Sequence, residues 1–281
     1  MDTDDRTARV YWLLIAAPLA MLAVFYLYPL AKVLWLSVTV PTPGFGNFAQ
    51  LYTSSAIQRI IGTTARICII TTVISLLLGY IVAYAALHVR SRQGELILFL
   101  VLLSFWLSVL IRAFAWLTLL QRRGVVNTTL LELGLISEPL ALVRNELGVL
   151  IGMVHYMVPY AALPLYANMK GIDPRLVPAA RGLGAGPVAA FWRVYLPNSV
   201  PGIVSAGILV FIFSLGFYVT PALLGGGRTI MIAEYIAVQI NDTLNWGTGT
   251  MLASALLATV LLLLAGMARF VDLRRVFGVK A

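Results

Sequence analysis

The chain has 281 residues, of which 60% are hydrophobic and only 11% charged, and its formal net charge is +9. Soluble domains carry about 25% charged residues, so this composition excludes an ordinary soluble protein and predicts a chain that lies in lipid. In such an apolar background the positive charge is typical of membrane loops, and it argues against nucleic-acid binding. With one cysteine, Cys68, and two histidines far apart, we expect neither an intramolecular disulfide nor a metal site.

Six apolar stretches are long enough to cross the hydrocarbon core of a membrane, which takes about 20 helical residues. In chain order they cover residues 12–37, 66–87, 96–120, 147–169, 200–224 and 246–268. The first is too long for the apolar core of a signal peptide, so we expect it to be an uncleaved span. A backbone in lipid must satisfy its own hydrogen bonds, which predicts an all-α polytopic membrane protein with six transmembrane helices. We expect residues 1–281 to form a single transmembrane domain.

The connectors on the outer side carry turn and helix signals. Residues 41–48 are rich in turn formers, and residues 225–229, Gly-Gly-Gly-Arg-Thr, predict a flexible turn. Residues 124–136 alternate apolar and polar side chains, which favours a short helix at the outer interface.

Lysines and arginines are distributed unequally between the two sides of these six spans. The termini and the loops on their side hold 12, whereas the opposite loops hold five. The remaining three, Lys32, Arg66 and Arg112, lie within spans. Because cytoplasmic loops are enriched in positive charge, both termini are predicted to be cytoplasmic.

The longest cytoplasmic loop, residues 170–201, contains helix signals that a simple connector does not need. Asp173 and Pro174 predict a helix start. Gly184 and Gly186 permit a left-handed turn that ends the helix, and Pro187 then starts a second short one. The loop is therefore expected to hold a small helix parallel to the membrane.

At this loop the chain resembles the membrane subunits of bacterial ABC importers. Their signature is Glu-Ala-Ala, three residues, Gly, nine residues, and Ile-x-Leu-Pro. The matching residues here are Ala179, Ala180, Gly184, Val194, Leu196 and Pro197, while Pro178 stands where the family has glutamate. The resemblance implies a type I importer permease fold, and it implies that this segment meets an ATPase. The departure at Pro178 affects the detailed contacts of the loop.

The resemblance extends to the spermidine/putrescine-type permeases through residues 106–116, 122–127, 217–236 and 245–257. It implies a multi-pass protein of the bacterial cytoplasmic (inner) membrane. It also implies three partners: an ABC ATPase dimer, a second permease subunit that is identical or homologous, and an external solute-binding protein.

The chain has no phosphate-binding loop of its own, because none of its three lysines follows a glycine. We therefore expect no catalytic residue and no cofactor in this chain, and ATP with Mg²⁺ to be bound by the partner ATPase. A stand-alone secondary transporter is the alternative class. Such transporters usually carry carboxylates within the membrane, and none falls inside the predicted spans.

A charged side chain within a span costs free energy, so Arg112 needs a reason to be there. It is either a residue of the substrate pathway or a structural charge. The other candidates for the substrate pathway are aromatic: Trp116, Tyr160, Phe217, Tyr218 and Tyr235. Resemblance favours a polyamine, which aromatic faces can hold by cation–π contact. The three positive charges within spans favour the alternative, an anionic or zwitterionic organic solute.

The charge distribution makes the topology testable. A reporter enzyme that is active only outside the cytoplasm is expected to be silent when fused after Ala281 and active when fused near Asn241. Activity in whole cells, normalised to the level of fusion protein, measures this. The opposite pattern contradicts the six-span arrangement.

Overall fold

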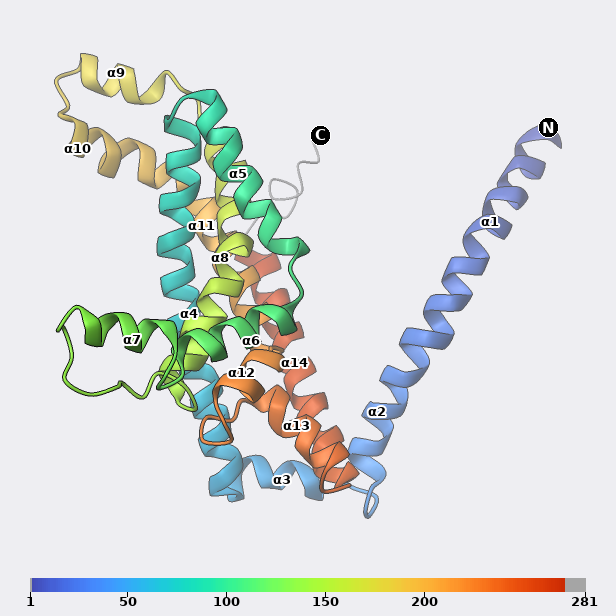
Figure 1. Ribbon diagram of the computed structural model, residues 1–281. Helices are drawn as coiled ribbons and strands as arrows, with labels where there is room; N and C mark the ends of the chain where they lie inside the picture. The colour runs from blue at the N-terminus through green and yellow to red at the C-terminus, as the bar shows by residue number, and fades with distance from the viewer. Residues whose placement is uncertain (1, 271–281) are drawn as a thin grey trace. The chain divides into compact units, whose positions relative to one another are not determined.

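The structure is a computed structural model that describes residues 2–270, and these residues form helices and connectors without a strand (Figure 1). This confirms the all-α prediction. Five helices are long and apolar enough to cross a membrane, and a bent helix pair makes six if it counts as one span. By internal contacts the chain divides into two compact units, which are described separately.

The first unit comprises the residues up to Gln58 together with Tyr235–Thr259. Its N-terminal helix is continuous through α1 (Asp2–Leu22), the π-helical turn η1 (Ala23–Leu27) and α2 (Tyr28–Thr39), in agreement with the first predicted span. The unit also contains α3 (Gly46–Thr53) and the larger parts of α13 (Ile232–Asn241) and α14 (Trp246–Phe270). A small core forms around Ile57, Met251 and Leu252, with Phe48 and Tyr235 packed against it.

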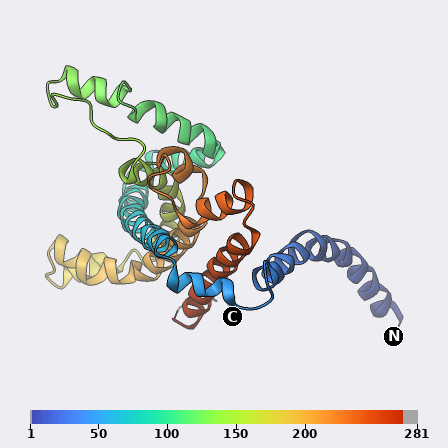
Figure 2. The ribbon, with the colours of Figure 1, turned by 90° about the horizontal axis from the view of Figure 1, so that it is seen from below.

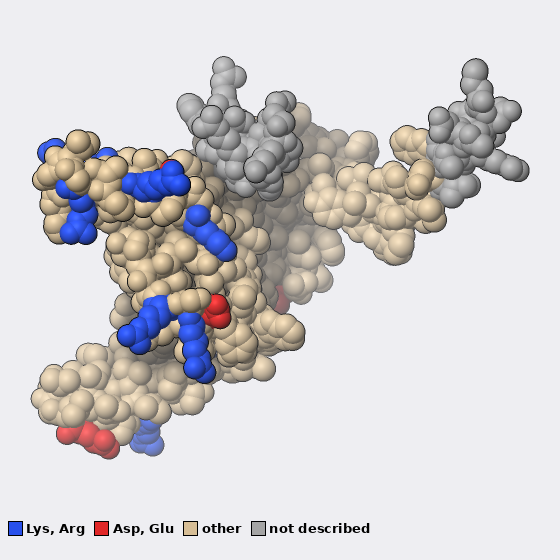
Figure 3. All heavy atoms as spheres, turned by 90° about the horizontal axis from the view of Figure 1, so that it is seen from above, with Lys and Arg blue, Asp and Glu red and all other residues tan. Residues whose placement is uncertain are grey.

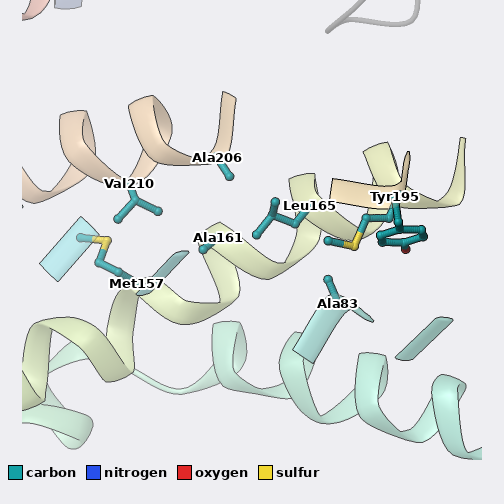
Figure 4. Packing of buried hydrophobic residues seen from close by; sticks show 8 residues of the cluster. Ala83, Met157, Ala161, Leu165, Tyr195, Ala206 and Val210 are labelled. Atoms are coloured by element: carbon teal, nitrogen blue, oxygen red, sulfur yellow. The ribbon is translucent and has the colours of Figure 1, made fainter. Parts of the chain in front are cut away.

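The second unit comprises Arg59–Glu234 and the residues from Val260 onwards. Its core lies among α4 (Ser55–His88), α8 (Glu146–Lys170) and α11 (Leu196–Leu215) (Figure 4). The buried cluster consists of Ala83, Met157, Ala161, Leu165, Met169, Tyr195, Ala206 and Val210. Alanine and glycine let these helices approach closely, which is how helices pack when no hydrophobic driving force exists between them in lipid.

Two glycines mark the closest approaches. A Cβ at Gly79 of α4 would lie 2.7 Å from the Cβ of Ala161 on α8. A Cβ at Gly202 of α11 would lie 2.6 Å from the Cβ of Asn168, also on α8. Both distances are too short for packed carbon atoms, so α8 can lie this close to both neighbours only because these positions carry no side chain.

The second predicted span begins too late. Helix α4 starts at Ser55, 11 residues before Arg66, and its 34 residues give a length of about 50 Å. The sequence did not predict this extension, because the first turns of α4 contain polar residues. Hydropathy identifies only the part of a helix that is apolar enough to lie in lipid.

The third predicted span, residues 96–120, is wrong as a single straight helix. It is broken into α5 (Ser91–Trp106) and α6 (Val109–Leu120), and the direction turns by 99° at the break. Leu107 and Ser108 adopt extended backbone angles there, and Ser108 is the N-cap of α6. The short helix expected within residues 124–136 is confirmed as α7 (Val125–Glu132).

The fifth predicted span, residues 200–224, is shifted. A continuous helix runs from Pro187 to Leu215 through α10 (Pro187–Ala190), the π-turn η2 (Phe191–Tyr195) and α11. The expected separate short helix at Pro187 is therefore the start of the span. A π-turn directly before Pro197 is the kind of insertion that accommodates a proline ring within a continuing helix.

This helix ends at Leu215, and α12 (Val219–Leu224) is a separate short helix. Phe217 and Tyr218, which the predicted span five included, therefore lie beyond the end of this helix. Figures 1 and 2 show α6 with α7 on one side of the second unit, and α9 (Leu176–Gly182) with α10 at one end of α8.

Gly79→Leu is expected to destabilise the chain by about 1–3 kcal/mol, because the new side chain overpacks the α4–α8 crossing. Gly62→Leu is the matched control on the same helix, since a Cβ there would meet no atom within 4 Å. Thermal unfolding of the purified chain in detergent compares the two. Equal midpoints for both variants would contradict the packing described here.

Candidate functional site

Five aromatic rings from three helices and one connector of the second unit form a cluster, here called the aromatic cluster, in which Phe105 and Phe213 are exposed and the other three rings are partly buried. Its members are Phe105 (α5), Tyr156 and Tyr160 (α8), Phe213 (α11) and Phe217. Ring centroids are 4.5 Å apart for Tyr156 and Phe217, 5.0 Å for Tyr160 and Phe213, and 4.9 Å for Phe105 and Tyr160. Spacings in this range are typical of attractive aromatic pairs.

Arg112 places its charge on this cluster. The guanidinium carbon lies 4.2 Å from the centroid of the Tyr156 ring. The side chain is only 8% exposed, and its Nε atom is buried without a hydrogen-bond partner among the described residues. The break between α5 and α6 produces this placement, because it puts Arg112 in the first turn of α6, with its N–H donating to the carbonyl of Ser108.

Trp116 lies one turn after Arg112 and contacts the same face of α8. Its indole Nε1–H donates to Nδ1 of His155 at 3.0 Å. Because an indole nitrogen can only donate, Nδ1 of His155 must be the acceptor in this arrangement. His155 is adjacent to Tyr156, so α6 is attached to α8 by a hydrogen bond and by the cation–π contact.

Four of the predicted pathway residues, Arg112, Trp116, Tyr160 and Phe217, come together in this region. Tyr218 follows directly and is 46% exposed. Tyr235 belongs to the first unit, where it packs against the Met251 core. Sequence reasoning left Phe105 and Phe213 out of the pathway. The four-residue spacing of Phe213 and Phe217, which matches that of Tyr156 and Tyr160, was the available signal.

The other charges expected near or within spans have different surroundings. Arg66 forms a salt bridge with Glu146, which offsets its charge. Lys32 is exposed on α2. Glu234, in the first turn of α13, is only 7% exposed, and its Oε2 atom has no partner among the described residues. Burial raises the pKa of the Glu234 carboxyl, and the backbone N–H of Met231 acts in the opposite direction.

The expected helix of the 170–201 loop exists as α9, but it begins at Leu176 and not at Asp173. Asp173 instead accepts a hydrogen bond from the backbone N–H of Arg175, which is the N-cap residue. Pro178 is thus the third residue of the helix. Its missing N–H costs nothing there, because the first turn has no intrahelical acceptors for its donors.

Gly184 ends α9 with a backbone φ of +91°, the left-handed conformation expected from the sequence. The N–H of Gly184 donates to the carbonyl of Arg181, and the N–H of Ala185 donates to that of Ala180. These two bonds form a Schellman motif, which requires a left-handed residue. Gly186 does not share this role, because its φ is −66°.

The remaining signature residues lie on the following helix. Val194 belongs to η2, and Leu196 and Pro197 open α11. On α9 and its C-terminal turn, apolar side chains face outward: Leu176, Pro178, Ala179 and Leu183 are exposed, and Leu183 is 91% exposed. A short rigid helix with an apolar outer surface is suited to contact with another protein.

A bundle of membrane helices with a partly exposed aromatic cluster and an exposed loop helix at one end is compatible with a transport subunit. Residues 75–276 match the family described as "Binding-protein-dependent transport system inner membrane component". The chain belongs to this family, and it is therefore a multi-pass protein of the inner membrane and a permease subunit. Membership of a binding-protein-dependent system favours an importer over a stand-alone secondary transporter.

Relatives and solved structures agree with this assignment. The chain is 32% identical to the spermidine/putrescine transport system permease protein PotB of Haemophilus influenzae over 218 residues, 78% of this chain and 76% of that protein. PotB of Escherichia coli K12 is 32% identical over 184 residues, covering 66% and 67%. The structure of a bacterial alginate ABC transporter with its alginate pentasaccharide-bound periplasmic protein matches with a TM-score of 0.77, at 18% identity over 95% of this chain and 96% of that chain. The structural likeness establishes the ABC importer permease fold.

Proposed function

We propose that this permease subunit moves a polyamine across the membrane, in an ATP-driven importer to which an external binding protein delivers the solute. The observation that carries the proposal is the contact between Arg112 and the Tyr156 ring. The guanidinium cation lies against this aromatic face and has no carboxylate partner among the described residues. The similarity to the two PotB proteins, named for spermidine and putrescine, supports the same class of solute.

The aromatic cluster offers further ring faces of the same kind. Tyr160, Phe213 and Phe217 belong to the same group of contacting rings, and only the Tyr156 ring carries Arg112. A polyamine has several ammonium groups separated by short apolar chains. Such a molecule suits a row of ring faces, since each cation–π contact contributes about 0.5–1 kcal/mol at an exposed site and about 2 kcal/mol where water is excluded.

An anionic or zwitterionic organic solute is the second candidate, and one observation favours it. The guanidinium of Arg112 is buried, and its Nε–H lacks an acceptor among the described residues. Because arginine binds carboxylates through two parallel hydrogen bonds, a carboxylate solute could supply the missing acceptor.

ATP hydrolysis is assigned to a separate ATPase dimer that docks on α9. The exposed apolar side chains of α9 would face that partner from the cytoplasm, and both chain termini would lie on the same side. ATP binding would then move α9 together with the cytoplasmic ends of α8 and η2, and hydrolysis would reset it. ATP and Mg²⁺ belong to the ATPase in this scheme.

A second permease subunit, identical or homologous, would complete the passage. The apolar surface of the first unit supports such a partner, because the apolar stretch of the N-terminal helix has no buried residue within this chain. Lipid covers whatever part of this helix the second subunit leaves free.

Gly184→Arg is expected to reduce solute-stimulated ATP hydrolysis of the assembled complex at least fivefold. A side chain at φ +91° strains the backbone by about 1–3 kcal/mol and disrupts the end of α9. Gly182→Arg is the matched control, because it adds the same charge two residues earlier at a position without positive φ and with free space. Normal stimulation in Gly184→Arg, or equal loss in both variants, would show that the conformation of this turn does not matter for coupling.

The nature of the solute is tested at Tyr160 and Arg112. Tyr160→Leu is expected to lower spermidine uptake about tenfold, since it removes a ring face that Arg112 does not occupy and that is worth about 1–2 kcal/mol, whereas Tyr160→Phe retains the ring and most of the uptake. Arg112→Ala is expected to lower uptake only as far as it lowers the amount of folded protein. Uptake into proteoliposomes that contain the full complex measures all three variants.

An anionic solute predicts the opposite result for Arg112→Ala. With a carboxylate solute, Arg112→Ala abolishes uptake while protein level and basal ATP hydrolysis persist. A complex that ignores spermidine and putrescine but moves a carboxylate would overturn the polyamine proposal.

A further inference from the structure

A cavity of about 600 Å³ lies in the second unit between α9 and the ends of three other helices, and it is here called the α9 cavity. Its walls come from the C-terminal ends of α4 and α8, from α9 itself and from η2. The lining residues that matter below are His88, Lys170, Asp173, Arg181 and Tyr195. The aromatic cluster described above contributes no residue to this cavity, so the two are separate sites.

The charges on the cavity wall are mainly positive. Lys170 and Arg181 line it, and neither forms a salt bridge with any described residue. Asp173 is the one carboxylate in the wall, and one of its oxygens already accepts the N–H of Arg175. Figure 3 looks onto this end of the molecule, where the visible charged atoms over α9 and α10 are mostly those of Lys and Arg. The wall therefore favours an anion.

Two further side chains add hydrogen-bonding capacity. The hydroxyl of Tyr195 is buried and has no partner among the described residues, although the side chain, only 7% exposed, lines the cavity. Since a buried hydroxyl without a partner is costly, a ligand that accepts its hydrogen bond would be favoured. His88 stacks on Tyr84 with ring centroids 3.9 Å apart, and its Nδ1–H donates to the carbonyl of that residue, so Nε2 stays free.

An apolar groove adjoins the α9 cavity and shares part of its wall. Tyr84, Pro187 and Phe191 line both, and the groove continues over side chains that are almost all apolar: Tyr80, Ile81, Ala85, Val188 and Trp192. Val188 and Trp192 are 68% and 62% exposed. The groove lies along helices that belong to the candidate spans Ser55–His88 and Pro187–Leu215, so its surroundings are lipid.

We infer that the α9 cavity and its groove bind one anionic phospholipid, with the phosphate headgroup near Lys170, Arg181 and the Tyr195 hydroxyl and an acyl chain along the groove. Each half of the site matches one half of this molecule in charge and polarity. Basic pockets between transmembrane helices at the cytoplasmic side are known to suit such headgroups. We assign this lipid to the cytoplasmic leaflet, which rests on the proposed orientation of the chain, with α9 in the cytoplasm.

A soluble phosphate compound shares the headgroup chemistry but leaves the groove unused. The groove therefore distinguishes the two sources. The same argument separates this site from the general attraction of a basic loop to an anionic membrane, which depends on charge but not on where in the loop the charge lies.

Native mass spectrometry of the purified full chain in detergent tests the inference by titration with phosphatidylglycerol, with phosphatidylcholine as the uncharged reference. The double variant Lys170→Gln/Arg181→Gln is expected to weaken phosphatidylglycerol binding at least tenfold, since it removes two charges at the headgroup. Arg175→Gln/Arg193→Gln is the matched control, because it removes two charges from the same cytoplasmic region at residues outside the cavity wall. It is expected to change binding less than twofold.

Two further measurements locate the lipid. Ala85→Phe fills the groove without changing any charge and is expected to weaken phosphatidylglycerol binding at least fivefold. Glycerol phosphate at millimolar concentration is expected not to displace the lipid. Equal losses in the two double variants, displacement by glycerol phosphate, or full binding in Ala85→Phe would each overturn the inference. These measurements need neither ATPase nor transported solute, so their failure would leave the importer proposal untouched.

Discussion

The arrangement of the second unit depends on how closely α8 can approach the helices around it. Gly79 allows contact with α4, Gly202 allows contact with α11, and Gly152 allows contact with α12, where a Cβ would lie 2.6 Å from the Thr220 methyl group. Helices in lipid gain little from burying apolar surface against one another, so their association relies on close van der Waals contact. Helix α8 is thereby held from several sides, and it carries both Tyr156 and Tyr160 of the aromatic cluster.

The apolar surroundings of these helices also explain how the charges of Arg66 and Arg112 are compensated. Arg66 is compensated by Glu146 at the start of α8, whereas Arg112 contacts an aromatic ring and has no carboxylate partner among residues 2–270. A guanidinium tolerates this better than an ammonium, because it is more weakly hydrated and stacks on aromatic faces. Arg112 thus shows that the aromatic cluster can hold a cation, and it also leaves a donor without an acceptor. The first property suits a polyamine, and the second would suit an anionic or zwitterionic solute.

Continuous helices join the aromatic cluster to α9. Helix α8 runs from the aromatic cluster to Lys170, and a turn then leads directly into α9. The continuous helix Pro187–Leu215 connects the other side of the α9 cavity with Phe213 of the cluster. A displacement of α9 would therefore act on two helices that carry cluster residues. A lipid in the α9 cavity would contact both of them as well, close to the surface that the ATPase is proposed to use.

The sequence by itself determined the all-helical membrane class, the approximate location of the spans and the presence of a loop helix that ends at Gly184. These features are local. A run of about 20 apolar residues must be helical in lipid, and a glycine at the end of a helix can adopt positive φ whatever surrounds it.

Only the tertiary structure decided where the third span breaks, where the fifth begins and ends, and which rings meet. Neither proline nor glycine marks the break at Leu107 and Ser108, and hydropathy is insensitive to backbone angles. Phe105, Arg112, Tyr156 and Phe213 come from four segments of the chain, so their proximity depends on how α5, α6, α8 and α11 pack. The α9 cavity likewise exists only because the ends of four helices meet, and no spacing of residues along one segment encodes that meeting.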